Sequence, residues 1–226
     1  MQIKKFNLII KKKLSKKNSK NILALSLDIT KSLDVKKMIN STINKFGKID
    51  VLINNAHSVP RKNPKISESF EKFPDDIWEI MVSETLRGLF FCTREVGKIM
   101  SKQNNGVVIN ISSIYGIVGP DQRIYGKNKL NSPIAYSVTK GGLVNMTRYL
   151  ASYWHGKNIR VNTLTLGGVF DKKLHNAKFI KNYSKKTILG RMACREDFDG
   201  ALLFLVSDAS SYMTGSNLVV DGGWTA

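Results

Sequence analysis

The amino-acid sequence predicts an α/β fold in which helices flank a parallel β-sheet within a single domain. Short runs rich in β-branched residues alternate with longer stretches of helical periodicity, a pattern typical of parallel strands joined by helices. The candidate strands are apolar almost without interruption, as expected for a sheet buried on both faces. With 226 residues, the chain is long enough to bury a sizeable core.

The strands and helices are expected to alternate along the chain. The expected strands are Ile22–Leu27, Ile49–Ile53, Val107–Ile111, Ile159–Leu164 and Asn217–Val220. The expected helices are Ser32–Phe46, about residues 75–100, Pro133–Trp154 and Asp197–Val206. In such sheets, ligands gather at the carboxyl ends of the strands, so functional side chains are expected directly after these runs.

The composition excludes several classes of protein. Hydrophobic residues make up 42% and charged residues 23% of the chain, which is ordinary for a globular domain. No apolar stretch is long enough for a membrane span, and Leu8–Ile10 is too short for a signal peptide. The two cysteines, Cys92 and Cys194, have no spacing that indicates metal or redox work, so a reducing, cytoplasmic setting without a metal site is expected.

The formal net charge of +19 is the unusual bulk property. Residues 1–20 form a lysine-rich segment with eight lysines and no acidic residue. Basic chains can bind nucleic acids, but lysines outnumber arginines 28 to 8, and no basic stripe carries interleaved aromatic residues. We therefore expect a solvated lysine-rich surface and rank nucleic-acid binding last.

A tyrosine and a lysine four residues apart are the first candidates for chemistry. Tyr136 and Lys140 fall on one face of an expected helix, and Ser112-Ser113 ends an expected strand. A nearby cation favours the phenolate, so these groups together can polarise a carbonyl and move a proton. Tyr-x-x-x-Lys also occurs at Tyr125/Lys129 in a loop composition and at Tyr153/Lys157 across Gly156. Only Tyr136/Lys140 lies early in a helix.

Six motifs, one of which contains this pair, follow one another along the chain. They are LDIT (Leu27–Thr30), DVLINNA (Asp50–Ala56), INISS (Ile109–Ser113), AYSVTKGGL (Ala135–Leu143), IRVN (Ile159–Asn162) and TGSNLVVDGG (Thr214–Gly223). Over residues 21–226 the sequence resembles the short-chain dehydrogenase/reductase family, single-domain oxidoreductases with a Rossmann-like fold that use NAD or NADP.

The resemblance implies roles for individual residues. Ser113 would hold and polarise the substrate oxygen, Tyr136 would be the catalytic acid/base, and Lys140 would assist Tyr136 and bind the nicotinamide ribose. The remaining cofactor contacts it implies are Asp28 at the adenine end, Asn55 and Ala56 along the cofactor's path, and Gly167 and Gly168 at the nicotinamide.

The sequence departs from the family pattern at its start. Family members open with a strand and the glycine loop TGxxxGxG, and none of the 17 glycines here falls in that pattern. We expect an N-terminally truncated Rossmann-like domain without the first strand and this loop, from a mis-started reading frame or, less readily, from loss of activity.

Smaller departures concern the site itself. Thr85 stands where the family has a catalytic asparagine, His57 where it has a glycine after NNA, and Leu166 where it has a proline. An extra stretch, Pro120–Asn131, separates Ser113 from Tyr136. It is expected to cover the active site, and its residues suited to a polar substrate are Asp121, Arg123 and Tyr125; a solvated surface insertion is an equal alternative.

Three functions remain open on the sequence. The first is an NAD(P)-dependent oxidoreductase that interconverts a secondary alcohol and a ketone. The insertion resembles that of family members in surface-sugar or flagellin-glycan pathways. The small-molecule substrate of this protein is therefore expected to be polar or sugar-derived, with a 3-oxoacyl thioester as the alternative. The second is a non-catalytic scaffold, since family members form homo-dimers or homo-tetramers through regions present here. The third, nucleic-acid binding, rests on charge alone.

Overall fold

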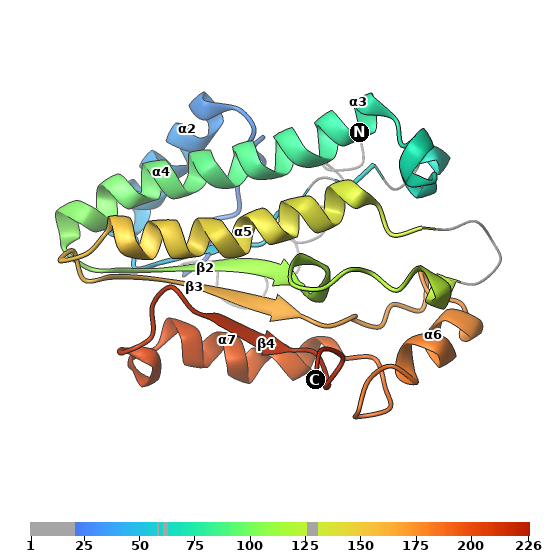
Figure 1. Ribbon diagram of the computed structural model, residues 1–226. Coiled ribbons are helices and arrows are strands. Elements are labelled where there is room, and N and C mark those ends of the chain that lie inside the picture. The colour runs from blue at the N-terminus through green and yellow to red at the C-terminus, as the bar shows by residue number, and fades with distance from the viewer. Residues whose placement is uncertain (1–20, 58, 61–62, 126–130) are drawn as a thin grey trace.

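A computed structural model describes residues 21–57, 59–60, 63–125 and 131–226 of the chain (Figure 1). The lysine-rich segment 1–20 lies outside the described residues. The described chain contains a four-stranded parallel sheet with the order β1-β2-β3-β4. The strands are β1 (Val51–Asn54), β2 (Gly106–Ser113), β3 (Ile159–Leu166) and β4 (Asn217–Val220). The predicted α/β class is confirmed, and four of the five expected strands form within a few residues of their expected bounds.

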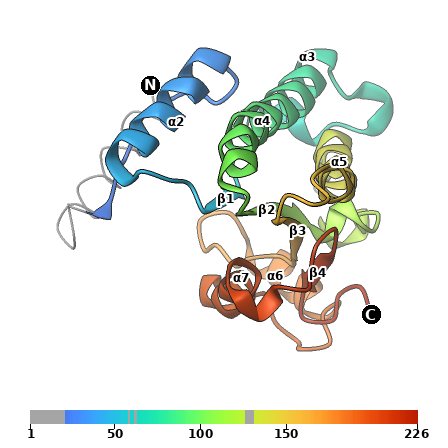
Figure 2. The ribbon, with the colours of Figure 1, turned by 90° about the vertical axis from the view of Figure 1, so that its left-hand side faces the viewer.

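Helices cover both faces of the sheet (Figure 2). On one face lie α4 (Thr85–Gln103) and α5 (Ile134–Tyr153), with α2 (Ser32–Phe46) packed against α4. Cys92, Val96 and Met100 of α4 join Val108 and Val161 of the sheet in one apolar core. The other face is covered by α7 (Asp199–Val206), whose Leu205 is fully buried against the central strands.

A row of buried polar side chains crosses the sheet beneath its carboxyl end. Asn54 of β1 donates to Asn110 of β2 over 2.9 Å, and Asn110 donates to Thr147 of α5 over 2.8 Å. Thr147 in turn shares a 2.7 Å hydrogen bond with Thr163 of β3. Because an unpaired polar group is costly in the interior, this row favours one register of the three strands and one position of α5 upon them.

The helix expected over about residues 75–100 consists of three parts. It begins as α3 (Asp75–Glu79), passes through a π-helical turn, η4 (Ile80–Glu84), and continues as α4. Two more helices differ from expectation: α7 is preceded by the 3-10 turn η7 (Arg195–Phe198), and α6 (Ala177–Ser184) was not expected. The remaining short 3-10 turns are η2 (Pro64–Ser67), η3 (Phe70–Lys72), η5 (Ile114–Gly116), η6 (Gln122–Tyr125) and η8 (Asp208–Ser210).

The prediction of a strand at Ile22–Leu27 is wrong. This segment has no regular secondary structure and belongs to no strand ladder, and the Lys45 ammonium donates to the carbonyl of Ile22. A strand requires a neighbour for its backbone hydrogen bonds, and β1 is paired only with β2 in the described part of the chain. The face of β1 is correspondingly open, with Val51 36% and Ile53 43% exposed. The expectation that every strand is buried on both faces therefore fails at β1.

Across the residues that the structure describes, no helix combines the length and the hydropathy needed to cross a bilayer.

Candidate active site

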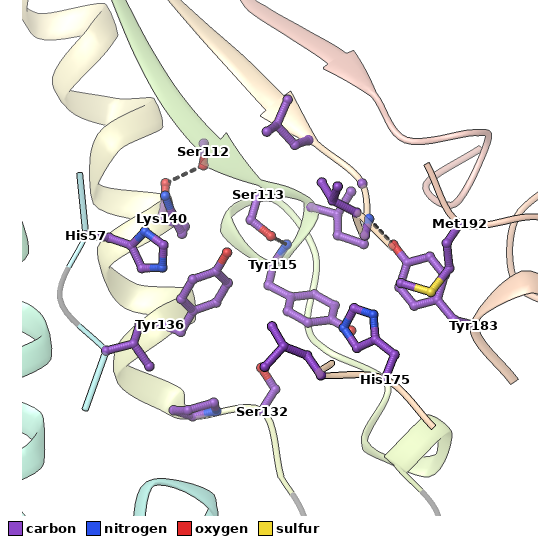
Figure 3. A pocket seen from close by; sticks show the side chains of 18 of the residues that line it. His57, Ser112, Ser113, Tyr115, Ser132, Tyr136, Lys140, His175, Tyr183 and Met192 are labelled. Carbon is purple, nitrogen blue, oxygen red and sulfur yellow. Dashed lines mark hydrogen bonds between the residues drawn. The ribbon is translucent and has the colours of Figure 1, made fainter. Parts of the chain in front are cut away.

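A cavity of about 480 Å³ opens at the carboxyl ends of β2 and β3, where the fold class predicts a ligand site (Figure 3). Its floor comes from the last residues of these strands and from the first turns of α5. Its outer wall comes from the short turn η6, the loop before α6, and α6 itself. Segments that are far apart in the sequence therefore meet around one space.

Ser113, Tyr136 and Lys140 line this cavity together. Ser113 is the last residue of β2, and Tyr136 lies in the first turn of α5, which begins directly after Pro133. The Lys140 ammonium lies 5.7 Å from the centre of the Tyr136 ring. Figure 3 shows the Tyr136 side chain directed toward Ser113. The structure thus brings together the three residues to which the motif analysis assigned the chemistry.

Lys140 is an unusual lysine because its side chain is almost entirely buried, with 4% of the residue exposed. Its ammonium donates to the carbonyl oxygen of Ile111 over 2.8 Å. Burial disfavours the charged form and lowers the pKa of Lys140 to about 8. The group still carries its proton for the most part at neutral pH, and a cation at this position favours the phenolate form of Tyr136.

The end of β2 is attached to α5 through Ser112. Ser112 donates from its hydroxyl to the carbonyl oxygen of Lys140 over 2.8 Å, and Ser113 accepts a longer bond of 3.3 Å from the backbone N–H of Tyr115. A Cβ at Gly116 would lie 2.6 Å from the carbonyl carbon of Lys140. The absent side chain at Gly116 therefore allows β2 and α5 to approach closely enough for their functional groups to share the cavity.

The backbone of Gly167 and Gly168 borders the cavity after β3. Both positions exclude a side chain, because a Cβ would lie 2.7 Å from the Asp221 backbone at Gly167 and 2.5 Å from the Tyr183 ring at Gly168. The hydroxyl of Tyr183 accepts a hydrogen bond from the backbone N–H of Gly168. Asn55 lines the cavity on the side of β1, while Ala56 is exposed and is not among the lining residues.

Two further residues implied by the resemblance lie away from the cavity. Asp28 precedes α2, where its carboxylate accepts hydrogen bonds from the backbone and hydroxyl of Thr30, which lowers the pKa of Asp28. Thr85 is buried at the start of α4, next to the π-helical turn η4. Neither residue lines the cavity.

The expectation that Asp121 and Arg123 face the same space as Tyr125 is not confirmed. Tyr125 lines the cavity, but Asp121 and Arg123 do not. The Arg123 guanidinium donates to both Asp121 oxygens, over 2.8 and 2.9 Å, and Lys186 forms an ion pair with the same carboxylate. These cations hold the pKa of Asp121 well below its usual range. The Asp121 carboxylate is therefore paired with Arg123 and Lys186, and its ion pair with Lys186 joins the insertion to the chain after α6.

The outer wall contains residues that sequence reasoning missed. They are Tyr115, Ser132, His175, Phe179, Tyr183 and Met192. His57 also borders the cavity, with its ring 6.0 Å from that of Tyr136 in an edge-on arrangement. One available signal was Asn176, whose side chain accepts from the backbone N–H of Phe179 and caps α6.

Among the residues that the structure describes, no group of three or more His, Cys, Asp or Glu side chains is placed to hold a metal ion. Cys92 is buried, and burial raises the pKa of its thiol to about 11.

The chain is similar to a known family and to known proteins. The family described as enoyl-(acyl carrier protein) reductase matches residues 9–225. The post-translational flagellin modification protein A of Campylobacter coli is 35% identical over 216 residues, which is 96% of this chain and 83% of that protein. An NAD-dependent glycerol dehydrogenase of Listeria innocua is 30% identical, over 92% of this chain and 77% of that protein.

A solved structure shows the same likeness in three dimensions. The short-chain dehydrogenase of Leptospira borgpetersenii, crystallised with bound NAD+, superposes with a TM-score of 0.80 at 35% identity. The superposition covers 89% of this chain and 75% of that protein. Together with the cavity that contains Ser113, Tyr136 and Lys140, these matches establish that the chain belongs to the short-chain dehydrogenase/reductase family.

Proposed function

We propose that this protein is an NAD(P)-dependent oxidoreductase that interconverts a secondary alcohol and a ketone on a polar or sugar-derived substrate. The observation that carries the proposal is the meeting of Ser113, Tyr136 and the buried Lys140 in one cavity. A hydroxyl, a phenol and a buried cation in this arrangement supply both a binding site for a substrate oxygen and a route for its proton.

Each of the three residues has a defined task. The Ser113 hydroxyl and the Tyr136 phenol bind the substrate oxygen. During alcohol oxidation the Tyr136 oxygen accepts the hydroxyl proton, and during ketone reduction it returns that proton. Lys140 stabilises the phenolate that is present before Tyr136 accepts the proton and after it returns it, and the bond of Lys140 to the Ile111 carbonyl fixes the ammonium in place.

The cavity fits the nicotinamide and ribose half of a dinucleotide. The backbone at Gly167 and Gly168 offers a surface without side chains, Lys140 supplies a donor for ribose hydroxyls, and Asn55 lies at the side of β1. When bound, the nicotinamide accepts or supplies the hydride while the protein handles the proton. The glycine loop that would hold the pyrophosphate is not present in this sequence, so cofactor affinity is the property to measure first.

Several observations favour a polar substrate. The described residues that line the cavity include hydroxyl, amide and imidazole side chains beside the catalytic group. A relative named for glycerol oxidation and another named for flagellin modification agree with such a substrate. The alternative, reduction of a 3-oxoacyl thioester, is favoured by the family description, which names acyl carrier protein chemistry. Turnover of a polyol against turnover of an acetoacetyl thioester distinguishes the two.

A scaffolding role would use a different surface. Between α4 and α5 lies a groove of about 810 Å³, bordered by Phe90, Tyr149 and Tyr153, which are 50%, 66% and 65% exposed. These aromatic side chains support assembly into a homo-dimer or homo-tetramer. Light scattering of the purified chain measures this assembly. An oligomer that binds neither dinucleotide would favour the scaffold over the enzyme.

The first test is a thermal-shift titration of the chain with NADH and with NADPH. A ligand that binds the folded state raises stability by about 2.7 kcal/mol at a hundred times its dissociation constant. We expect a saturable shift with one of the two cofactors. The absence of a shift with both would contradict the proposed activity of this chain.

The second test replaces Tyr136 by phenylalanine. Tyr136→Phe removes the proton donor and keeps the ring, so we expect turnover to fall by roughly a thousandfold or more while cofactor affinity stays within about twofold. Steady-state kinetics and the same titration measure both quantities. Retained turnover would show that the roles are assigned wrongly.

A further inference from the structure

The insertion between Ser113 and Tyr136 forms part of the cavity wall through its turn η6. Gln122, near the start of the insertion, is joined to Ser132, directly after it: the Gln122 side chain accepts from the backbone N–H of Ser132 over 2.8 Å and donates to the Ser132 carbonyl over 3.2 Å. Ile124 is 3% exposed, and its carbonyl accepts a bond from Asn182 of α6. The turn is thus fixed to α6, and Tyr125 is placed at the cavity.

A row of aromatic rings continues from Tyr125 along the wall. The centre of the Tyr125 ring lies 5.4 Å from the centre of the Phe179 ring. The Phe179 ring in turn stacks on the ring of His175, with the two centres 4.9 Å apart. The row extends through Tyr183 to Trp224, 4.3 Å further on. The insertion, the loop before α6, α6 and the chain after β4 each contribute a ring. Aromatic rings packed in this way have fixed orientations.

His175 presents a hydrogen-bond donor in this row. Its Nδ1 accepts a hydrogen bond from the backbone N–H of Asp171 over 3.2 Å. When Nδ1 of an imidazole accepts a hydrogen bond, its Nε2 is the ring nitrogen that carries the N–H. Tyr125 adds a hydroxyl that can donate or accept. The wall therefore combines ring faces with polar edges.

The described lining of the cavity contains basic side chains and no acidic ones. Its described lining residues include Lys140 and two histidines but no aspartate or glutamate. Carbon chains with several hydroxyl groups have C–H faces that pack on aromatic rings and oxygens that hydrogen-bond to N–H and O–H groups at the ring edges. The wall offers both kinds of contact at the side of the cavity away from Lys140 (Figure 3).

We propose that Tyr125 and His175 form a specificity subsite that binds the hydroxyl-bearing chain of the substrate beyond its reacting carbon. The proposal rests on the proposed function, because Ser113 and Tyr136 fix where the reacting carbon lies. It assigns to the insertion the selection of substrate through Tyr125. It assigns to Asp121, with Arg123 and Lys186, the positioning of that turn.

The experiment compares two four-carbon secondary alcohols, threitol and 2-butanol, which differ in the number of hydroxyl groups. We expect Tyr125→Ala to lower kcat/KM for threitol about tenfold, as for the loss of one well-placed polar contact, and that for 2-butanol by less than about twofold. Tyr125→Phe keeps the ring and should retain part of the preference. The matched control Tyr212→Ala alters a fully exposed tyrosine on the turn before β4 and should leave both values unchanged.

Two results would overturn the subsite. One is an equal loss on both alcohols in Tyr125→Ala, which indicates a structural role. The other is an unchanged preference for threitol in Tyr125→Ala and in His175→Ala.

A binding measurement separates the subsite from the catalytic proposal. Saturation-transfer NMR detects threitol on the protein without turnover, and we expect a titration with threitol to give about tenfold weaker binding in Tyr125→Ala than in the wild type and in Tyr212→Ala. Threitol that binds in this pattern without being oxidised would contradict the proposed function and support the subsite. The absence of binding to the wild type would overturn the subsite itself.

Discussion

The centre of the described sheet and its edge at β1 differ in how completely they are covered. At the centre, β2 and β3 lie between helices on both faces, and Ile109 and Val161 are fully buried. At β1, Ile53 is 43% exposed although it pairs in register with Ile109. The same residue type in the same sheet layer therefore has two environments. An apolar run of residues therefore predicts that a strand pairs with a neighbour, whereas the burial of that strand depends on which helices the rest of the chain packs over it.

Truncation of the two paired isoleucines gives the largest expected contrast. Ile109→Ala leaves a cavity in the core and should lower the free energy of unfolding by about 4 kcal/mol, whereas Ile53→Ala should lower it by about 1 kcal/mol. Urea unfolding measures both values. Equal losses would show that the open face of β1 is covered in solution.

Lys140 provides a contrast within the well-covered region, because a charge is buried there. Its pKa in the folded protein is about 8, below the ordinary value of 10.5, so the unfolded chain binds the proton more tightly. The free energy of unfolding should then rise by up to roughly 3 kcal/mol as the pH increases from about 8 to about 10.5.

Lys140→Met should remove this rise. Urea unfolding across the pH range measures it, and Lys157→Met, which alters an exposed lysine, is the control and should keep the pH dependence of the wild type. Parallel curves for the wild type and Lys140→Met would contradict the assignment of a burial-depressed pKa to Lys140.

The smallest effect is expected at the cavity wall, which is held by side chains and not by the sheet. Asp121→Asn weakens the attachment to Arg123 and Lys186 and should raise KM for threitol about threefold while kcat stays constant, since no reacting group moves. Asp50→Asn is the control, because it alters a surface ion pair with Lys48 far from the cavity. A fall in kcat in Asp121→Asn would show that the wall influences the chemistry.

Features that depend on residues close together in the sequence could be predicted, whereas features that depend on contacts between distant residues could not. Tyr136 and Lys140 were identified because their spacing places them on one helical face and because the pair lies early in an expected helix. Ile22–Leu27 was misassigned because a strand depends on a distant partner that its own residues do not encode. Asp121 was expected at the substrate, yet its partner Lys186 lies 65 positions later in the chain and could not be inferred from local sequence.

The helix α6 shows the same limit. It has eight residues, most of them partly or fully exposed, so its periodicity is too short to stand out. Its importance comes from Phe179 and Tyr183, whose neighbours Tyr125 and Trp224 come from other parts of the chain. The outer wall of the cavity therefore depends on tertiary packing, whereas most of its floor could be predicted from local sequence patterns.

The junction between Gln122 and Ser132 has a consequence for how such enzymes diversify. Since the chain leaves and re-enters the wall at one point, closed by two hydrogen bonds, the length and composition between these residues can vary without shifting the strands or α5. A change in this stretch would then alter the proposed subsite and leave the proposed proton-transfer residues in place.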